Sequence, residues 1–226
     1  MRTALYVFSA TGNCLTTARE LARRLGDCRI VSVAWARKQP RILEDAEQVG
    51  FVFPVYYGNM PYPVREVVAK MVLKAEAHVF TVTTCRGHVG AANQRMDQLL
   101  RTRGQKLSLA LGIPMPGNSY LSTPEEERVC LAQQKERIEA LLEPIRNRQI
   151  QDCFQPELLP LTPVDYPNNF RGIVAEASCI GCGTCVSVCP QSCIDSSNTP
   201  FVIDPHHCLH CGNCVSVCPV SAVERR

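Results

Sequence analysis

Eight of the 14 cysteines of this chain fall in two copies of one pattern, CxxCxxCxxxCP, and each cysteine of the second copy lies 29 positions after its counterpart. Two cysteines separated by two residues can turn their sulfurs onto one metal centre, and a third at the same step adds a third corner of a cubane. The fourth ligand then comes from the other copy, because the cysteine before the proline ligates the second cluster in such runs. The pattern therefore predicts two [4Fe-4S] clusters with crossed ligands. One set is Cys179, Cys182, Cys185 and Cys218, and the other is Cys208, Cys211, Cys214 and Cys189.

Zinc and disulfides are the competing explanations for so many cysteines. Zinc sites use CxxC pairs set well apart rather than two triplets each followed by Cys-Pro, and nothing marks the chain as secreted, so clusters are favoured. A ninth cysteine, Cys193, occupies the position where the second copy has Ala222. We therefore expect Cys193 to be a small packing residue, and a spare ligand only in a damaged cluster.

The segment from 172 to 226 resembles the bacterial two-cluster ferredoxins, through both CxxCxxCxxxCP runs. A segment of this length cannot bury much apolar core of its own, and small domains of this kind usually need a metal or disulfide staple. We therefore expect the clusters to form its core and its folding to depend on them.

The composition changes along the chain and suggests three parts. Its 226 residues give room for one ordinary domain and a small one. Residues 1–150 carry alternating helical and strand patterns, and the cysteine repeats lie in 172–226. Between them, 151–171 is rich in proline, with four within 155–170, and is expected to be a fairly stiff linker.

Charge and hydropathy argue against several classes of protein. The N-terminal sequence lacks the parts of a signal peptide, and no apolar run reaches membrane-spanning length. Free thiols and iron–sulfur ligands fit a reducing cytoplasm. The net charge is +3; Lys and Arg number 21 against 17 acids in 1–170, and 3 against 4 from residue 171. No basic strip with interleaved aromatic residues is present, so nucleic-acid binding is not expected.

The N-terminal part reads as strands alternating with helices. The predicted strands are 4–9, 29–35, 49–57, 78–84 and 107–112, and four of them are followed by helix-compatible segments, the weakest after the second. The clearest helical spacing is that of Val64, Val67, Val68, Met71 and Val72. Strands alternating with helices imply an α/β, doubly wound, five-stranded parallel sheet in a flavodoxin-like order. The whole chain is then this α/β domain followed by a small α+β two-cluster domain.

Helix ends support this interpretation. The first predicted helix ends near Gly26. Thr123 is the predicted N-cap of the last helix, Pro124 is its first residue, and Glu126 is the partner of Thr123 in a capping box.

The loop after the first strand is a candidate phosphate site. It reads Ser9, Ala10, Thr11, Gly12, Asn13, Cys14 and runs straight into a helix. Hydroxyls and backbone N–H groups at a helix N-terminus bind phosphate, and Gly12 lets the backbone approach closely. The loop has no lysine, so a monophosphate fits better than a triphosphate. We expect the Cys14 thiol to be unreactive.

Two further loops follow the third and fourth strands, at the edge where such sheets bind ligands. Aromatic and thioether side chains in the first loop could cover a flat ring, although Tyr57 could equally be a core residue. The residues of these loops are Pro54, Tyr56, Tyr57, Gly58, Asn59 and Met60 in the first, and Thr84, Cys85, Arg86, Gly87 and His88 in the second.

With these loops, residues 1–150 resemble the flavodoxins, and the best motif is the FSATGN segment. The resemblance implies one FMN, with its phosphate at Ser9–Cys14 and its ring between the next two loops. The sequence departs from the family in having Cys14 for the last threonine of the phosphate motif and Asn59 for an acid. Together the two halves look like the flavodoxin–ferredoxin fusion proteins of anaerobic prokaryotes.

The leading interpretation is an electron carrier between FMN, two clusters and a redox protein partner. The alternatives are an FMN-dependent reductase or oxidase of a small organic substrate, with His88, Tyr56 and Tyr57 as candidate proton donors, and a subunit of a larger reductase. The sequence has no convincing acid–base pair, so we assign no catalytic residue. No GxGxxG follows a strand, so a dedicated NAD(P)H site is not expected.

Overall fold

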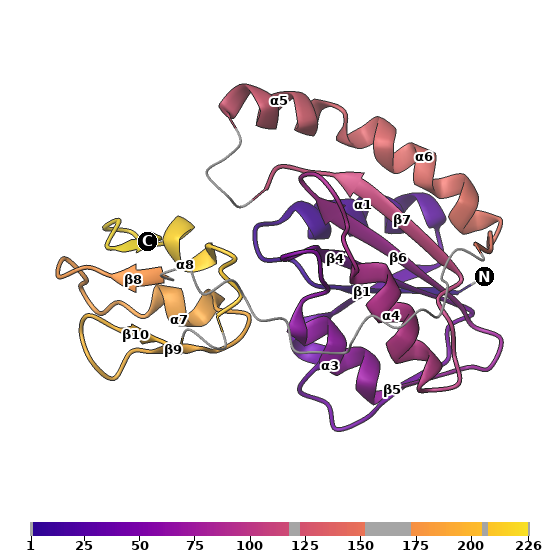
Figure 1. Cartoon of the computed structure of the whole chain (residues 1–226), viewed down its shortest axis with the longest axis horizontal. Helices are drawn as coiled ribbons and strands as arrows, with labels where there is room; N and C mark the ends of the chain where they lie inside the picture. The colour runs from indigo at the N-terminus through magenta and orange to yellow at the C-terminus, as the bar shows by residue number, and fades with distance from the viewer. Residues whose placement is uncertain (1, 118–122, 152–172, 205–207, 226) are drawn as a thin grey trace. The chain divides into compact units, whose positions relative to one another are not determined.

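A computed structural model of the chain describes residues 2–117, 123–151, 173–204 and 208–225. The chain divides into two compact units, Met1–Thr162 and Pro163–Arg226. Figure 1 colours the first from indigo to salmon and the second from orange to yellow. Apart from Gln151, the predicted linker lies outside the described residues.

Five parallel strands form the central sheet of the first unit. They are β1 (Thr3–Val7), β2 (Cys28–Ser32), β4 (Gln48–Pro54), β6 (His78–Cys85) and β7 (Leu109–Pro114). The order across the sheet is β2-β1-β4-β6-β7, and every neighbouring pair is parallel. Counted along the chain, this order is 2-1-3-4-5, the flavodoxin-like arrangement of a doubly wound sheet. The predicted fold class is confirmed.

Helices cover both faces of this sheet (Figure 1). On one face α1 (Asn13–Leu25) packs against α6 (Gln134–Arg146), and on the other α3 (Tyr62–Lys70) packs against α4 (Ala92–Arg101). The main apolar core lies under α1 and α6, because its members come from these two helices and from the sheet. Its largest buried members are Leu5, Leu21, Phe80, Leu109, Ile113, Leu142 and Ile145.

The helix-end predictions are confirmed. α1 ends at Leu25, before Gly26, and α5 (Pro124–Ala132) begins with Pro124. The Thr123 hydroxyl accepts a hydrogen bond from the Glu126 amide at 3.2 Å, while the Glu126 carboxylate accepts one from the Thr123 amide at 2.7 Å. This reciprocal pair is the expected capping box.

Some predicted boundaries were wrong. The second predicted strand (29–35) ends at Ser32, and α2 (Val33–Ala36) follows it. The third (49–57) ends at Pro54, and the fifth (107–112) is shifted to Leu109–Pro114. Met71 and Val72 do not extend the helix before them; they belong to β5 (Met71–Leu73), which pairs in parallel with β3 (Ile42–Glu44). Met71 is buried and Val72 is partly buried, and both fit the helical spacing by chance. The apolar pattern therefore could not distinguish the end of the helix from the start of a short strand.

The described residues of the second unit, 173–204 and 208–225, form two short antiparallel strand pairs and two short helices. β8 (Ile173–Ala175) pairs with β11 (Val223–Arg225), and β9 (Ile194–Asp195) pairs with β10 (Val202–Ile203). The helices are α7 (Thr184–Val188) and α8 (Asn213–Ser216), one in each cysteine repeat. The outer strands β8 and β11 thus join the two ends of the unit.

The backbone of the second unit repeats with the sequence. Gly183 and Gly212 precede α7 and α8 with φ of 72° and 77°, and Ser192 and Ser221, also 29 residues apart, have φ of 54° and 52°. Because positive φ is unusual for serine, two equivalent serines in this conformation show that both copies of the repeat adopt one local fold.

Candidate cofactor sites

The loop between β1 and α1 presents an open helix N-terminus. Gly12 precedes the helix with φ 100° and, having no side chain, gives the first amides of the helix no side-chain cap. The Ser9 hydroxyl accepts a hydrogen bond from the Gly12 amide at 3.2 Å, which holds the loop in a tight turn. A Cβ at Gly12 would meet no atom within 4 Å. The loop therefore places the N-terminus of α1 beside free space, as a phosphate site requires.

Cys14 lies in the core beneath this loop. Its side chain is 2% exposed, its sulfur lies 3.1 Å from the Thr84 hydroxyl, and burial raises the pKa of its thiol to about 12. The expectation of an unreactive thiol agrees with this environment. Only the backbone of Cys14 can contribute to a phosphate site in this loop. Its side chain contacts Thr84 near the end of β6.

The loop after β4 forms a tight turn. Tyr56 and Asn59 exchange two backbone hydrogen bonds of 3.0 and 2.9 Å, and between them Tyr57 and Gly58 both have positive φ, 51° and 72°. This is a type I′ turn, which seldom contains a tyrosine. Tyr57 is 43% exposed, whereas Met60 is 9% exposed. Of the residues expected to cover a flat ring, Tyr57 is thus partly exposed, and Met60 is mostly taken up by packing.

The loop after β6 begins inside the protein and then emerges. Thr84 is buried and Cys85 half-buried, and burial raises the pKa of the Cys85 thiol. Arg86, Gly87 and His88 are exposed. The hydrogen bonds from Thr123 lower the pKa of the Glu126 carboxyl at the start of α5, and the charge of Arg86 adds a smaller contribution in the same direction.

These three loops meet at one edge of the sheet. They leave the carboxyl ends of β1, β4 and β6, which are neighbours in the sheet. A contact that sequence reasoning missed joins two of them: the Ala91 amide donates a hydrogen bond to the Gly58 carbonyl at 2.7 Å. Gly58 and Gly90 touch backbone to backbone. No local pattern could reveal this contact, because its partners are 32 residues apart and both lack side chains.

In the second unit, the eight repeat cysteines surround two separate cavities. Among the eight repeat cysteines, three from one repeat and the Cys-Pro cysteine from the other line each cavity. The first cavity is lined by Cys179, Cys182, Cys185 and Cys218, and the second by Cys208, Cys211, Cys214 and Cys189. These are the two ligand sets expected from crossed ligation. Within the described residues, no three Cys, His, Asp or Glu side chains converge closely enough to hold a single metal ion.

The cysteines also make up much of this unit's core. Cys185, Cys208 and Cys214 are buried together with four apolar residues, and further cysteines pack around them. Burial raises the pKa of the Cys185 thiol and raises that of Cys214 to about 12. Such thiols give up their protons when a metal binds, so cluster assembly and the protonation of this core are coupled. The four apolar residues are Ile173, Ile194, Phe201 and Val223.

Several donors point at the ligand sulfurs. The His210 amide lies 3.4 Å from the Cys208 sulfur, and the Ala222 amide lies 3.2 Å from that of Cys218. Hydrogen bonds to cluster sulfurs tune reduction potentials, so each site carries its own backbone donor.

Cys193 is closer to the second site than the sequence suggested. It packs in this core as expected, but it also lines the second cavity, with its sulfur 3.5 Å from that of Cys189. The hydrogen bond from Cys193 is the first cause that lowers the pKa of the Cys189 thiol.

The comparisons with known proteins agree with the second unit's geometry. Residues 178–222 match the family model of the 4Fe-4S dicluster domain. No curated protein matches the chain at a significant level. Among the described residues, no helix has both the length and the apolar character needed to span a membrane.

Solved structures align with the first part of the chain. A flavodoxin from the domain Archaea is 14% identical, with 65% of this chain and 99% of that chain covered and a TM-score of 0.36. An FMN-dependent NADH-azoreductase from Bacillus anthracis, in complex with FMN, is 9% identical, with coverages of 63% and 100% and a TM-score of 0.41. Rubredoxin oxygen:oxidoreductase from Desulfovibrio gigas is 12% identical, with coverages of 65% and 36% and a TM-score of 0.40.

The strand order and the family match together define the class of this protein. A flavodoxin-like α/β unit is followed by a ferredoxin-type 4Fe-4S dicluster domain, so the chain has the architecture of a flavodoxin–ferredoxin fusion. This combination supports an electron-transfer or redox role.

Proposed function

We propose that the chain is an electron carrier that passes electrons between one FMN and two [4Fe-4S] clusters, and onward to a redox protein partner. The observation that carries the proposal is the division of the repeat cysteines into two crossed sets of four, each around its own cavity. Two one-electron centres in one small unit suit a flavin that exchanges up to two electrons, because the clusters can deliver or remove them singly.

The cysteines would serve as ligands to clusters that store and release single electrons. The chain's own contribution is to hold the thiolates in place and to set their surroundings. Cys218 and Cys189 each cross to the other repeat's site, so neither site is complete without both repeats. The backbone donors at Cys208 and Cys218 stabilise negative charge on the sulfurs, which favours the reduced state.

The edge of the sheet fits FMN. The open turn at Gly12 and the uncapped start of α1 would take the phosphate. The exposed Tyr57 and the loop from Thr84 to His88 would contact the ring. FAD is disfavoured because the loop suits a terminal phosphate and the chain has no second nucleotide-binding half. These cofactors and the free thiols fit the reducing cytoplasm of an anaerobic cell.

Anaerobic reconstitution tests the proposal directly. The protein should bind about eight iron and eight sulfide, as two four-iron clusters require, and acid should release one FMN per chain. Release of FAD or riboflavin would contradict the flavin assignment. After selective reduction of the clusters, rapid mixing should show the flavin becoming reduced within the same chain. Flavin that stays oxidised would mean that the units do not exchange electrons.

The same preparation separates a carrier from an enzyme. A carrier should turn over only when a redox protein is supplied. Steady turnover of a small organic substrate without any protein partner would favour the reductase or oxidase instead.

A further inference from the structure

The turn after β4 and the loop before α4 touch through two glycines. A Cβ added to Gly90 would lie 2.5 Å from the Gly58 Cα, 2.6 Å from its carbonyl oxygen and 2.9 Å from its carbonyl carbon. All three are backbone atoms, so no side-chain rotation could relieve the overlap. The position accepts only glycine while the two loops keep this separation.

Hydrogen bonds hold the same contact from both sides. The peptide group between Gly58 and Asn59 uses its carbonyl to accept from the Ala91 amide at 2.7 Å, and its N–H to donate to the Tyr56 carbonyl at 2.9 Å. With both of its polar groups satisfied by the protein, this peptide is fixed in orientation. The turn that carries Tyr57 is thereby attached to the loop that follows Arg86, Gly87 and His88.

The conformation of Tyr57 shows why such an attachment is needed. A tyrosine with φ 51° is in the left-handed region, which is unfavourable for a residue with a Cβ. Strained conformations of this kind persist only where the surroundings hold them. The Gly58–Gly90 contact and the Ala91 hydrogen bond restrain the residue that follows Tyr57 in this turn.

We propose that Gly90 is a positioning residue for the flavin: through its contact with Gly58 it fixes the spacing between the two ring-binding loops before FMN arrives. This inference rests on the proposed function. A pre-set spacing removes part of the ordering that binding would otherwise require. The contact joins Gly58, the residue beside Tyr57 in the turn, to Gly90, two residues before α4.

The variant Gly90→Ala tests this role. We expect its dissociation constant for FMN to rise about tenfold or more, because the preformed spacing is lost. The visible circular dichroism of the bound flavin should also change, since it reports the groups around the ring. The matched control is Gly104→Ala: Gly104 has φ +72°, but a Cβ there meets nothing within 4 Å. It introduces backbone strain without separating any loops, so FMN binding should be unchanged.

The outcomes separate the inference from the proposed function. If wild type binds FMN and Gly90→Ala binds it with the same dissociation constant and the same dichroism, the positioning role is wrong while the function stands. If wild type itself binds no FMN, the proposed function fails, and the role of Gly90 fails with it.

A measurement on wild type keeps the idea testable even if Gly90→Ala does not fold. In the flavin-free chain, the Ala91 amide should exchange hydrogen slowly, because it donates to the Gly58 carbonyl across the contact. Exchange at the rate of an open chain would show that the loops are not joined before FMN binds, and would overturn the inference.

Discussion

The two units of this chain differ in how much of the candidate cofactor site belongs to the apolar core. In the first unit the core is made of apolar strands and helices, and the candidate flavin loops lie at one edge of the sheet, with Cys14 as the residue of the phosphate loop that belongs to this core. In the second unit the candidate ligands are themselves core residues, and Cys185, Cys208 and Cys214 are among its buried members. The first unit should therefore fold without its cofactor, whereas the second should not.

The largest effect should follow from breaking one crossed ligand. Cys218→Ala removes a ligand of the first cavity, and the nearby repeat position is Ala222, so no spare thiol is available there. Iron should fall from about eight to about four per chain, as expected for loss of one of two four-iron clusters. Electron paramagnetic resonance of the remaining cluster should be that of the site at Cys208.

Cys193→Ala is the control for this experiment and should keep its iron, because Cys193 is not one of the eight predicted ligands. Damage to the cluster held by Cys208, Cys211 and Cys214 in the Cys218→Ala protein would mean that ligation is not crossed.

A core change in the first unit should leave the second unit unaffected. A Cβ on Gly50 would lie 2.6 Å from the Leu5 side chain and closer still to Phe80, and both side chains are fully buried. Gly50→Ala should lower the unfolding free energy of the first unit by about 1–3 kcal/mol through overpacking. Iron content should not change. Gly112→Ala is the matched strand control, since its Cβ would make only ordinary contacts from 3.5 Å, and its melting temperature should stay close to wild type.

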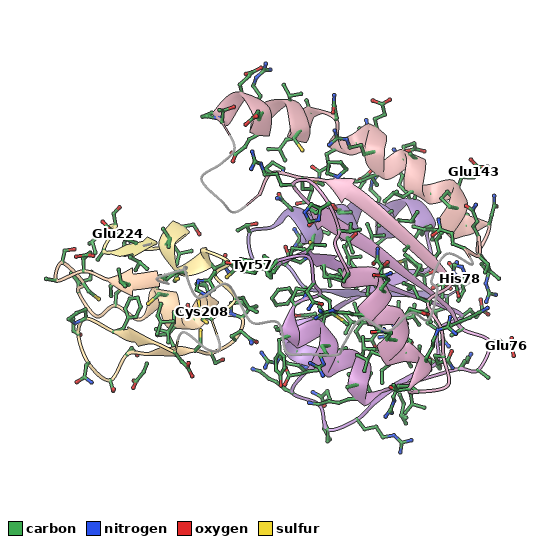
Figure 2. All side chains as sticks on the ribbon, in the orientation of Figure 1. Tyr57, Glu76, His78, Glu143, Cys208 and Glu224 are labelled. Carbon is green, nitrogen blue, oxygen red and sulfur yellow. The ribbon has the colours of Figure 1, made fainter. Side chains whose placement is uncertain are left out.

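Acid should also weaken the first unit selectively. His78 lies at the opposite end of the sheet from Tyr57 (Figure 2), and burial lowers its pKa. Its Nε2 donates to the Gln149 carbonyl at 2.9 Å, so Nδ1 carries no proton and faces the Gln48 amide nitrogen at 3.4 Å. Because the unfolded chain binds this proton more readily, the stabilisation is present above the unfolded pKa of about 6.5 and is lost as pH falls through the lowered folded pKa.

Urea unfolding at several pH values measures this dependence. His78→Gln should flatten the decline below about pH 6.5. His88→Gln, which changes an exposed histidine, should keep it. An identical slope in wild type and His78→Gln would assign the decline to other groups.

The smallest expected effect distinguishes the two repeats from each other. The Thr184 hydroxyl lies 3.4 Å from the Cys182 sulfur and must donate when that sulfur is a thiolate. At the equivalent position Asn213 donates instead to the Val188 carbonyl at 3.1 Å. Thr184→Val should lower the first cluster's reduction potential slightly, by roughly twofold in the reduction equilibrium, or about 18 mV.

Potentiometry followed by electron paramagnetic resonance can resolve that shift. Ser216→Ala is the control, because its hydroxyl donates to the Asn213 carbonyl and not to a sulfur. A shift of equal size in both variants would remove Thr184 from the tuning of this site.

The difference between the units also explains what the sequence could predict. The spacing of the cysteine repeat predicts two sets of four ligands, and the structure groups the same residues around two cavities. The strand order followed from alternating patterns and loop residues. The Gly58–Gly90 contact and the burial of Met60 could not be predicted, because they depend on how distant segments pack. Cys193 was expected to be a packing residue from its alignment with Ala222, but its distance to Cys189 needed the folded backbone.

Hydrogen exchange on the full chain, with and without iron, tests the central contrast most directly. On removal of iron under anaerobic conditions, amides in β8, α7, α8 and β11 should lose their protection, while those in β1, β4 and β6 should keep it. Removal of FMN should change exchange only in the loops after β1, β4 and β6. Retained protection in the second unit without iron, or global loss of protection in the first unit without FMN, would contradict the account.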